Sequence, residues 1–299
     1  ILALSFVWSV ALAGRFVDRF GKGMRTAARD DLIAARTKPE QQGLAFGLHR
    51  SMDTMGAVLG PLLALALVRA HVPLRWIFAI AVIPGLLSVL VILWLGKEHR
   101  VEPRRNAFHL SLPASPAFRW LLAGSILFAV GNSSDMFILL RAKDLGMSTA
   151  AVILLYVLYN VTYAAASLPL GGLSDRVGQF PMVLTGYALF AAVYLGFATA
   201  RSGWTLAALF GIYGLYIAAT EGTSKALIGR AIPTGERASA LGLYYTATGL
   251  AAFAASTIGG VLWGAVGPWA TFAYGAAAAL AAAALMLTGR GRVRRALEA

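Results

Sequence analysis

The sequence of 299 residues contains no cysteine, so this segment has no disulfide bond, thiolate metal site or cysteine nucleophile. Its four histidines, His49, His71, His99 and His109, lack the close spacing of metal-binding motifs. Charged residues are scarce as well, at 13% of the sequence, whereas a typical soluble domain has about 25%. We therefore expect neither a metal site nor a cofactor.

Hydrophobic residues predominate in the sequence. They make up 59% of the sequence, and the mean hydropathy is +0.71, more than one soluble core requires. Acidic residues number 13 against 26 lysines and arginines, which gives a net charge of +13. The basic residues lie mainly between apolar runs, so they indicate membrane topology and do not predict a nucleic-acid partner. The expected partner is the lipid bilayer.

Apolar runs long enough to cross the hydrocarbon layer as helices, about 20 residues each, occur nine times. The first six residues resemble the end of an earlier span. The sequence therefore predicts an all-α polytopic membrane helix bundle, in which short polar turns make sequential helices antiparallel neighbours. The nine predicted spans are residues 8–34, 43–68, 74–95, 119–141, 148–170, 181–199, 204–232, 238–263 and 268–287.

A polar stretch at residues 96–118, rich in proline and arginine, is typical of an exposed linker. It divides the chain into an incomplete N-terminal half, 1–95, and a C-terminal half, 119–299, which ends in a basic tail. Lysine and arginine concentrate in the linker and the tail. Because basic loops stay in the cytoplasm, we expect both segments to be cytoplasmic.

An internal repeat indicates that the chain has two related halves. When the sequence is shifted by 195 residues, one loop with the ends of its two flanking helices superposes on a second such loop, and the helices cross the membrane in the same direction. A chance match remains an alternative, because the chain is rich in alanine, glycine and leucine. If the repeat is real, about three helices precede Ile1, and the fold has two halves of six. The superposed pairs are Leu32-Ile33 on Leu227-Ile228, and Ala45, Gly47 and Leu48 on Ala240, Gly242 and Leu243.

A charged side chain within a bilayer costs about 3 kcal/mol, so such residues usually face a cavity or a partner. Five charged residues from Arg15 to Arg29 follow steps of three and four, which aligns them on one helix face. We expect Arg15 and Asp18 to face a solvated cavity. The charges at 25–31, Asp30 among them, are expected at the cytoplasmic interface, where they would reach water.

The next predicted helix carries Arg50 and Asp53 at i, i+3, followed by two glycines four residues apart and a proline, Gly56, Gly60 and Pro61. Arg50 and Asp53 are candidate cavity or coupling residues. The two glycines allow close helix packing and Pro61 bends the helix. We favour a packing role for the glycines.

In the C-terminal half, a polar run at 131–135 interrupts an apolar helix, which predicts a local break lining a binding pocket through Asn132 and Asp135. Asp135 either titrates a proton or pairs with a charge on another helix. On the following span, Tyr159 and Asn160 belong to a polar-aromatic face. That face can bind an amphipathic solute or simply hydrogen-bond another helix.

Glu221 and Lys225 stand at i, i+4 deep in the span 204–232, where they can pair within one helix. Two interpretations remain open for this pair. It is either a coupling device made and broken during transport or a static structural ion pair.

Residues 171–178, G-G-L-S-D-R-V-G, resemble the loop signature of the major facilitator superfamily through Gly171, Asp175, Arg176 and Gly178. Gln179 and Phe180 replace the basic pair that usually follows. Arg15 with Gly21 is similar to the arginine pattern of the family's fourth helix, which is implicated in proton transfer. The segment 56–61 is similar to the fifth-helix motif associated with antiporters.

The resemblance implies two pseudo-symmetric six-helix halves that alternate access to a central site. It also implies proton-coupled efflux of a small solute by a monomer in the inner cell membrane. An uptake symporter or facilitator of the same fold is the alternative. From other classes, a non-transporting helical scaffold or a membrane-embedded enzyme remains. The enzyme is disfavoured, because no catalytic residues, neither a clustered nucleophile and base nor a metal set, are visible in the sequence.

Overall fold

A computed structural model gives the architecture, and every regular element in the part of the chain that it describes is a helix. The predicted all-α fold is therefore confirmed. Contacts divide the chain into two compact units, one of Ile1–Thr26 with Leu59–His109 and the other of Ala27–Val58 with Leu110–Ala299. The division into halves at the linker stays a prediction. The described residues are 10, 14, 26, 29–95, 115–232 and 236–298.

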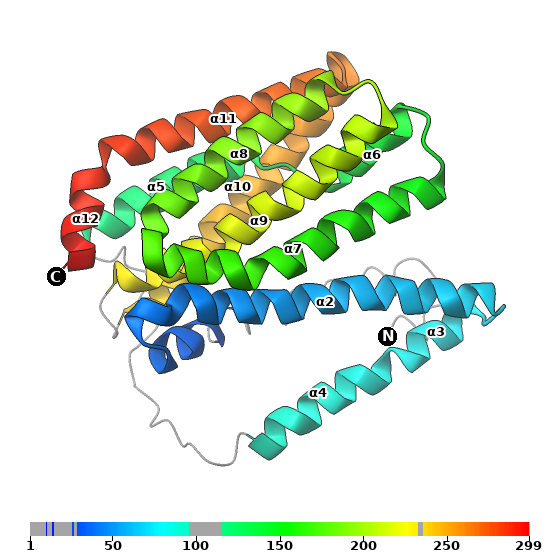
Figure 1. Ribbon diagram of the computed structural model, residues 1–299, viewed down its shortest axis with the longest axis horizontal. Coiled ribbons are helices and arrows are strands. Elements are labelled where there is room, and N and C mark those ends of the chain that lie inside the picture. The colour runs from blue at the N-terminus through cyan, green and yellow to red at the C-terminus, as the bar shows by residue number, and fades with distance from the viewer. Residues whose placement is uncertain are drawn as a thin grey trace. The chain divides into compact units, whose positions relative to one another are not determined.

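Eight helices are long and apolar enough to cross a membrane, and they coincide with eight of the nine predicted spans. The ninth, 8–34, lies mostly outside the described residues, as does most of the linker 96–118. Residues 29–36 are helical. The labelled elements are η2 (Pro39–Gln41), α2 (Gln42–Arg69), α3 (Leu74–Ile80), α4 (Val82–Leu95), α5 (Pro116–Gly131), α6 (Met136–Asp144), α7 (Thr149–Val177), α8 (Gln179–Thr199), α9 (Gly203–Arg230), α10 (Arg237–Ala265), α11 (Pro268–Thr288) and α12 (Arg290–Glu298) (Figure 1).

Two predicted spans are each built from two helices. The span 119–141 is broken at 132–135 between α5 and α6, which confirms the predicted break. The span 74–95 is divided at Ala81 into α3 and α4, which was not predicted. Pro84 in the first turn of α4 has no N–H to donate to the carbonyl of Ile80, so the helical hydrogen bonding is interrupted there.

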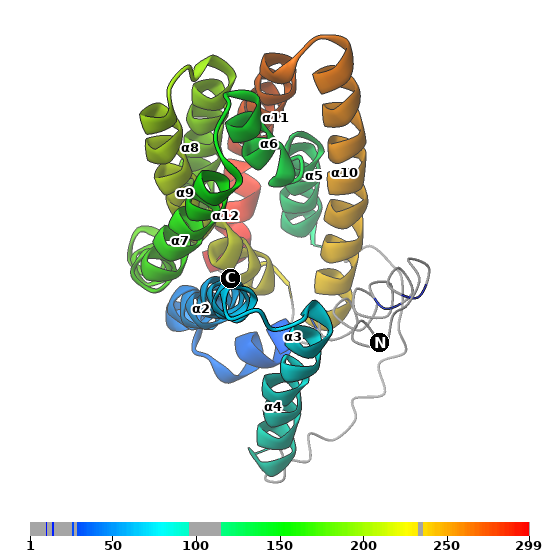
Figure 2. The same cartoon turned by 90° about the vertical axis from the view of Figure 1, so that its right-hand side faces the viewer.

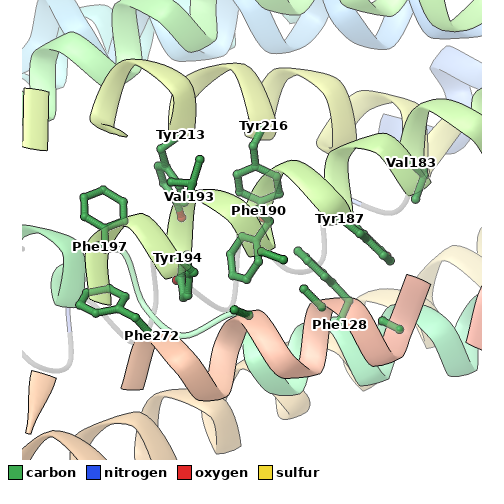
Figure 3. Packing of buried hydrophobic residues seen from close by; sticks show 14 of the residues in the cluster. Phe128, Val183, Tyr187, Phe190, Val193, Tyr194, Phe197, Tyr213, Tyr216 and Phe272 are labelled. Carbon is green, nitrogen blue, oxygen red and sulfur yellow. The ribbon is translucent and has the colours of Figure 1, made fainter. Parts of the chain in front are cut away.

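The larger unit is held together by helix pairs around an aromatic core. Helix α9 packs against α7 and α8, α11 packs against α8 and α5, and α10 packs against α5 (Figures 1 and 2). Between α5, α8, α9 and α11, half of the buried side chains of the core cluster are Phe or Tyr (Figure 3). The Phe128 and Tyr187 rings stack with centroids 4.0 Å apart, and the Phe190 and Tyr194 centroids lie 3.8 Å apart. Such pairs add about 1 kcal/mol beyond the burial of their area.

The outer surface of the helices is apolar. On α10, Leu250, Phe253 and Val261 have exposed fractions of 67%, 75% and 64%. Large apolar side chains rarely gather on the surface of a soluble monomer, because water contact with them is unfavourable. Together with eight helices of membrane-spanning length, they show a multi-pass membrane protein.

Glycines bring α2 and α7 into backbone contact. A Cβ atom on Gly43 would lie 2.5 Å from the carbonyl oxygen of Gly171, which leaves no room for a side chain at this crossing. A Cβ atom on Gly171 would in turn lie 3.0 Å from the carbonyl carbon of Gly43. About two turns away, Ser51 Oγ donates to the carbonyl of Ala164 at 2.7 Å. Small residues at the crossing thus fix α2 on α7 within the larger unit.

We predict that Gly171→Ala destabilises the protein, because its methyl group would press against the Gly43 backbone. Overpacking of this kind costs about 1–3 kcal/mol and should lower the melting temperature in detergent. Gly172→Ala is the matched control, since a Cβ there meets only Leu44 Cδ1 at 3.4 Å. Equal melting temperatures for both variants would contradict a tight α2–α7 crossing.

Candidate functional site

The larger unit contains a partly open cavity of about 450 Å³ between α5, the break before α6, α8, α9 and α10, a volume suited to a small organic solute. Of the described lining residues, six are aromatic and three are Asp, Glu or Lys. The lining comprises Ser125, Phe128, Ala129, Asn132, Asp135, Tyr187, Tyr213, Tyr216, Ile217, Thr220, Glu221, Ser224, Lys225, Tyr244, Tyr245, Thr248, Gly249 and Ala252.

Asp135 marks one end of this cavity. It is the N-cap residue of α6, directly after the helix break. The Tyr213 hydroxyl donates to its Oδ1 at 2.7 Å, and the Tyr159 hydroxyl donates to its Oδ2 at 3.4 Å. Among the described residues, no lysine, arginine or histidine forms an ion pair with Asp135. Of its two predicted roles, pairing with another charge therefore finds no support in this part of the chain.

Neighbouring helices hold the break that carries Asp135. Gly131 lies so close to α11 that a Cβ atom there would be 3.0 Å from the carbonyl oxygen of Gly275. On the other side, the Ser256 hydroxyl of α10 accepts the backbone N–H of Ser134 at 3.2 Å. Backbone groups freed from helical bonding thus find partners within the bundle, as membrane depth requires.

The other end of the cavity contains Glu221 and Lys225, one turn apart on α9. Lys225 Nζ lies 3.9 Å from Glu221 Oε1, so the predicted i, i+4 pair exists, but each residue has a nearer partner on another element. Arg50 of α2 forms an ion pair with Glu221, and Tyr163 of α7 donates a hydrogen bond to it. The pair is thus part of a network between helices.

Asp30 completes this network from the helical residues 29–36. Its side chain is 0% exposed, and Lys225 Nζ lies 3.3 Å from its Oδ2. Arg29 Nε donates to Oδ1 at 2.9 Å, and the Tyr245 hydroxyl of α10 donates to Oδ2. The expectation that Asp30 reaches interfacial water is therefore wrong, because protein partners surround its carboxylate.

Among the described residues, the ion pairs of the network balance in charge. They join three cations and three carboxylates, because Asp53 also accepts from Arg50 Nη1 at 3.0 Å. A buried charge is tolerated only when it is paired and hydrogen-bonded, and the buried Asp30 and Lys225 meet this condition by pairing with each other. The members are Arg29, Arg50 and Lys225, and Asp30, Asp53 and Glu221. Asp135 stands apart from them.

The remaining predicted site residues differ in whether they contact the cavity or Asp135. Tyr159 contacts Asp135 from behind, while the Asn160 amide donates to the carbonyl of Tyr156 in its own helix at 2.8 Å. Asn132 lines the cavity, and its amide donates to the Tyr216 hydroxyl at 3.4 Å. Arg15 and Asp18 lie outside the described residues.

The glycines of α2 show no packing partner in the described part of the chain. No described atom lies within 4 Å of a Cβ built on Gly56 or Gly60, and Pro61 lies within α2. Their packing role therefore stays a prediction.

The loop signature forms a cap on another helix. Both carboxylate oxygens of Asp175 accept hydrogen bonds at 2.8 Å, from the backbone N–H groups of Gly43 and Leu44 in the first turn of α2. Gly178 has a φ of 97°, which an L side chain rarely adopts, and it makes the tight turn between α7 and α8. Gln179, at the place of the usual basic residue, donates to Asp175 at 3.2 Å. Arg176 is exposed at the end of α7.

The sequence matches the Major Facilitator Superfamily over residues 1–141 and again over residues 121–298. The chain belongs to this superfamily. An uncharacterised transporter of the superfamily from Methanocaldococcus jannaschii is 35% identical over 295 residues, which cover 96% of this chain and 74% of that protein. The predicted family is confirmed, and it supports a role in membrane transport.

Two more distant proteins also match the chain. An uncharacterised protein of Mycobacterium tuberculosis is 25% identical over 281 residues, which cover 88% of this chain and 66% of that protein. The crystal structure of the human organic anion transporter MFSD10 superposes with a TM-score of 0.76, covering 95% of this chain and 72% of that one. At 18% identity this similarity shows the major facilitator fold alone.

We predict that Lys225→Met lowers the stability of this superfamily member, because it leaves the buried Asp30 carboxylate without its α9 partner. Breaking a buried pair costs on the order of 3 kcal/mol, so the melting temperature in detergent should fall clearly. The double variant Asp30→Asn with Lys225→Met should recover part of the loss. Lys143→Met is the control, since Lys143 is exposed and donates a hydrogen bond to the exposed Thr149 hydroxyl at 2.7 Å. A double variant no more stable than Lys225→Met alone would contradict the pairing.

Proposed function

We propose that the protein exports a small solute across the inner cell membrane in exchange for protons, by alternating access to the described cavity. The observation that carries this proposal is Asp135. It lines the cavity and has no ion-pair partner among the described residues, so it can gain or lose a proton without breaking a salt bridge. Carboxylates at membrane depth are typical of proton relays in transporters.

In this proposal, the ion network is the gate that opens and closes one end of the cavity. Glu221, Lys225 and Tyr245 line the end of the cavity opposite Asp135, and Arg50 and Asp30 contact them from α2 and from residues 29–36. Solute passing this end has to separate Arg50 from Glu221 and Lys225 from Asp30. In this proposal the paired network is the closed state of the cavity on the side predicted to be cytoplasmic.

Asp175 stabilises the same state. A carboxylate at a helix N-terminus is favourable, because it accepts unpaired N–H groups and meets the positive end of the helix dipole. Here that helix is α2, which also carries Arg50. Moving α2 away from α7 would break the Asp175 cap and the Arg50–Glu221 pair together. We therefore propose a gating role for Asp175 and its loop signature.

Transport in everted membrane vesicles tests the direction and the coupling. A screen of the full-length gene in cells without their major exporters first supplies a solute. With an acidic vesicle interior, we expect uptake of that solute, because protons leaving the interior would drive export from the cytoplasmic face. Collapse of the pH gradient should abolish the accumulation, and Asp135→Asn should remove its dependence on the gradient.

Asp144→Asn is the matched control for that experiment. Asp144 lies at the other end of α6, is exposed and pairs with Arg141 at 2.5 Å, so its loss should leave coupling unchanged. Accumulation driven by a gradient of the opposite sign would instead indicate an uptake symporter. Transport that ignores the gradient would indicate a facilitator, and either result would overturn export by antiport.

We predict that Glu221→Gln opens the cavity toward the side of the network, because a neutral amide holds Arg50 less strongly. The 299 residues contain no cysteine, so a Thr248→Cys substitution provides the one thiol of this segment inside the cavity. Its labelling by an impermeant maleimide in everted vesicles should speed up about fivefold, the effect of about 1 kcal/mol on a two-state equilibrium.

Asp53→Asn provides the comparison for this labelling experiment. Asp53 also pairs with Arg50, but half of its side chain is exposed and it does not line the cavity. Its loss should change the labelling rate little. Unchanged labelling in Glu221→Gln would show that the network does not close the cavity.

A further inference from the structure

We infer that the solute is an organic monocation: an amine whose ammonium group binds Asp135 while a flat apolar body lies among the aromatic rings of the cavity. This inference rests on the proposed transport function and goes beyond it by naming the chemical class of the solute. Charge balance, carboxylate geometry and the aromatic walls each support it.

Among the described residues, charge balance leaves Asp135 as the carboxylate of the cavity without a cationic partner. Apart from tyrosines, the ionisable residues of the described lining are Asp135, Glu221 and Lys225. Glu221 and Lys225 belong to the balanced network, whereas Asp135 has only phenol hydroxyls as partners among the described residues. Phenols donate hydrogen bonds but bring no charge. A carboxylate in a low-dielectric site is best compensated by a cation, which an entering amine supplies.

The geometry of the carboxylate leaves room for an ammonium group. Tyr213 donates to Oδ1 and Tyr159 donates to Oδ2, so each oxygen has one hydrogen bond and keeps a second lone pair. These two tyrosines come from different helices and fix the orientation of the carboxylate. Asp135 and Tyr213 line the cavity, while Tyr159 lies behind Asp135. We therefore assign Tyr159 and Tyr213 as positioning residues for Asp135.

The walls beyond Asp135 suit an apolar ring. Phe128 and Tyr187 are stacked with an interplanar angle of 1°, and the Tyr213 and Tyr216 centroids lie 5.3 Å apart (Figure 3). Aromatic faces attract both flat apolar groups and cations, the latter by about 0.5–2 kcal/mol. Tyr213 and Lys225 are twelve residues apart on α9, about 18 Å along the helix, so the cavity is long enough for a head and a body.

An organic anion fits these contacts poorly. Lys225 is the cation that lines the cavity among the described residues, and it already lies 3.3 Å from Asp30 and 3.9 Å from Glu221. An anion would have to displace these carboxylates and would also meet the charge of Asp135. The cavity therefore favours the cation over an anion of the same size.

Three compounds with the same indole ring test the inference by calorimetry on the full-length protein in detergent at pH 7. Tryptamine carries an ammonium group, N-acetyltryptamine is neutral, and indole-3-propionate is an anion. We expect tryptamine to bind at least about tenfold more tightly than the other two, a difference of about 1.4 kcal/mol. Asp135→Asn should remove this advantage and leave N-acetyltryptamine binding unchanged.

Further variants separate charge recognition from misfolding. Asp135→Glu keeps the charge and should keep the order of affinities, even if Asp135→Asn proves unstable. Tyr213→Phe should weaken tryptamine binding about threefold without affecting N-acetyltryptamine, because it removes one hydrogen bond that orients the carboxylate. Asp144→Asn should bind all three compounds as the unaltered protein does.

Several outcomes would overturn the inference: tighter binding of indole-3-propionate, equal binding of tryptamine and N-acetyltryptamine, or binding of none of the three. Its failure differs from failure of the proposed function. Asp135-dependent, gradient-driven transport of a neutral or anionic solute would refute the cation alone. Selective tryptamine binding by a protein that moves no solute in vesicles would instead refute transport.

Discussion

Compensation of charge inside an apolar bundle is the constraint on which this structure depends. A charged group that is buried among apolar side chains needs a partner of opposite sign or a set of hydrogen bonds. The network around Glu221 and Lys225 meets that requirement with groups from residues 29–36, α2, α7, α9 and α10. Because its members come from so many segments, the same contacts that satisfy the charges also hold those segments together. A movement that opens the cavity at this end must exchange these ion pairs for other partners.

Aromatic side chains form the core of the rest of the larger unit. Asp135 lies at the edge of this core, apart from the ion network. The rings between α5, α8, α9 and α11 form a continuous core, and the tyrosines at its edge turn their hydroxyls toward Asp135 and Asn132. The helix break at 132–135 is tied to α10 by Ser256. One end of the cavity thus carries Asp135 within a packed aromatic core, while ion pairs lie at the other end. That asymmetry suits a carrier in which recognition and gating occur at different places.

Most of the fold could be predicted from the chain itself. Eight described spans and the break after Gly131 follow from local rules of hydrophobic length and polar interruption. The division of the span 74–95 was missed, although Pro84 signals it, because a proline inside a membrane-spanning helix is also compatible with one continuous, bent helix. Asp135, Glu221 and Lys225 could also be identified from the sequence as candidate site residues. Each is a charged residue within a predicted membrane span, and the cost of placing a charge there can be judged without knowing its contacts.

Which groups compensate those charges was decided by tertiary structure. Tyr245 and Asp30 are 215 residues apart and hydrogen-bond each other, and no spacing or motif connects them. Asp30 had the sequence context of an interfacial residue, yet it is buried because α9 and α10 bring Lys225 and Tyr245 to it. Tyr213 likewise has no local feature that distinguishes it from the other core tyrosines. By itself, the sequence determined which segments enter the membrane and which charges need partners. The packing of the helices determined the partners, because a contact between distant segments depends on how every helix between them is placed.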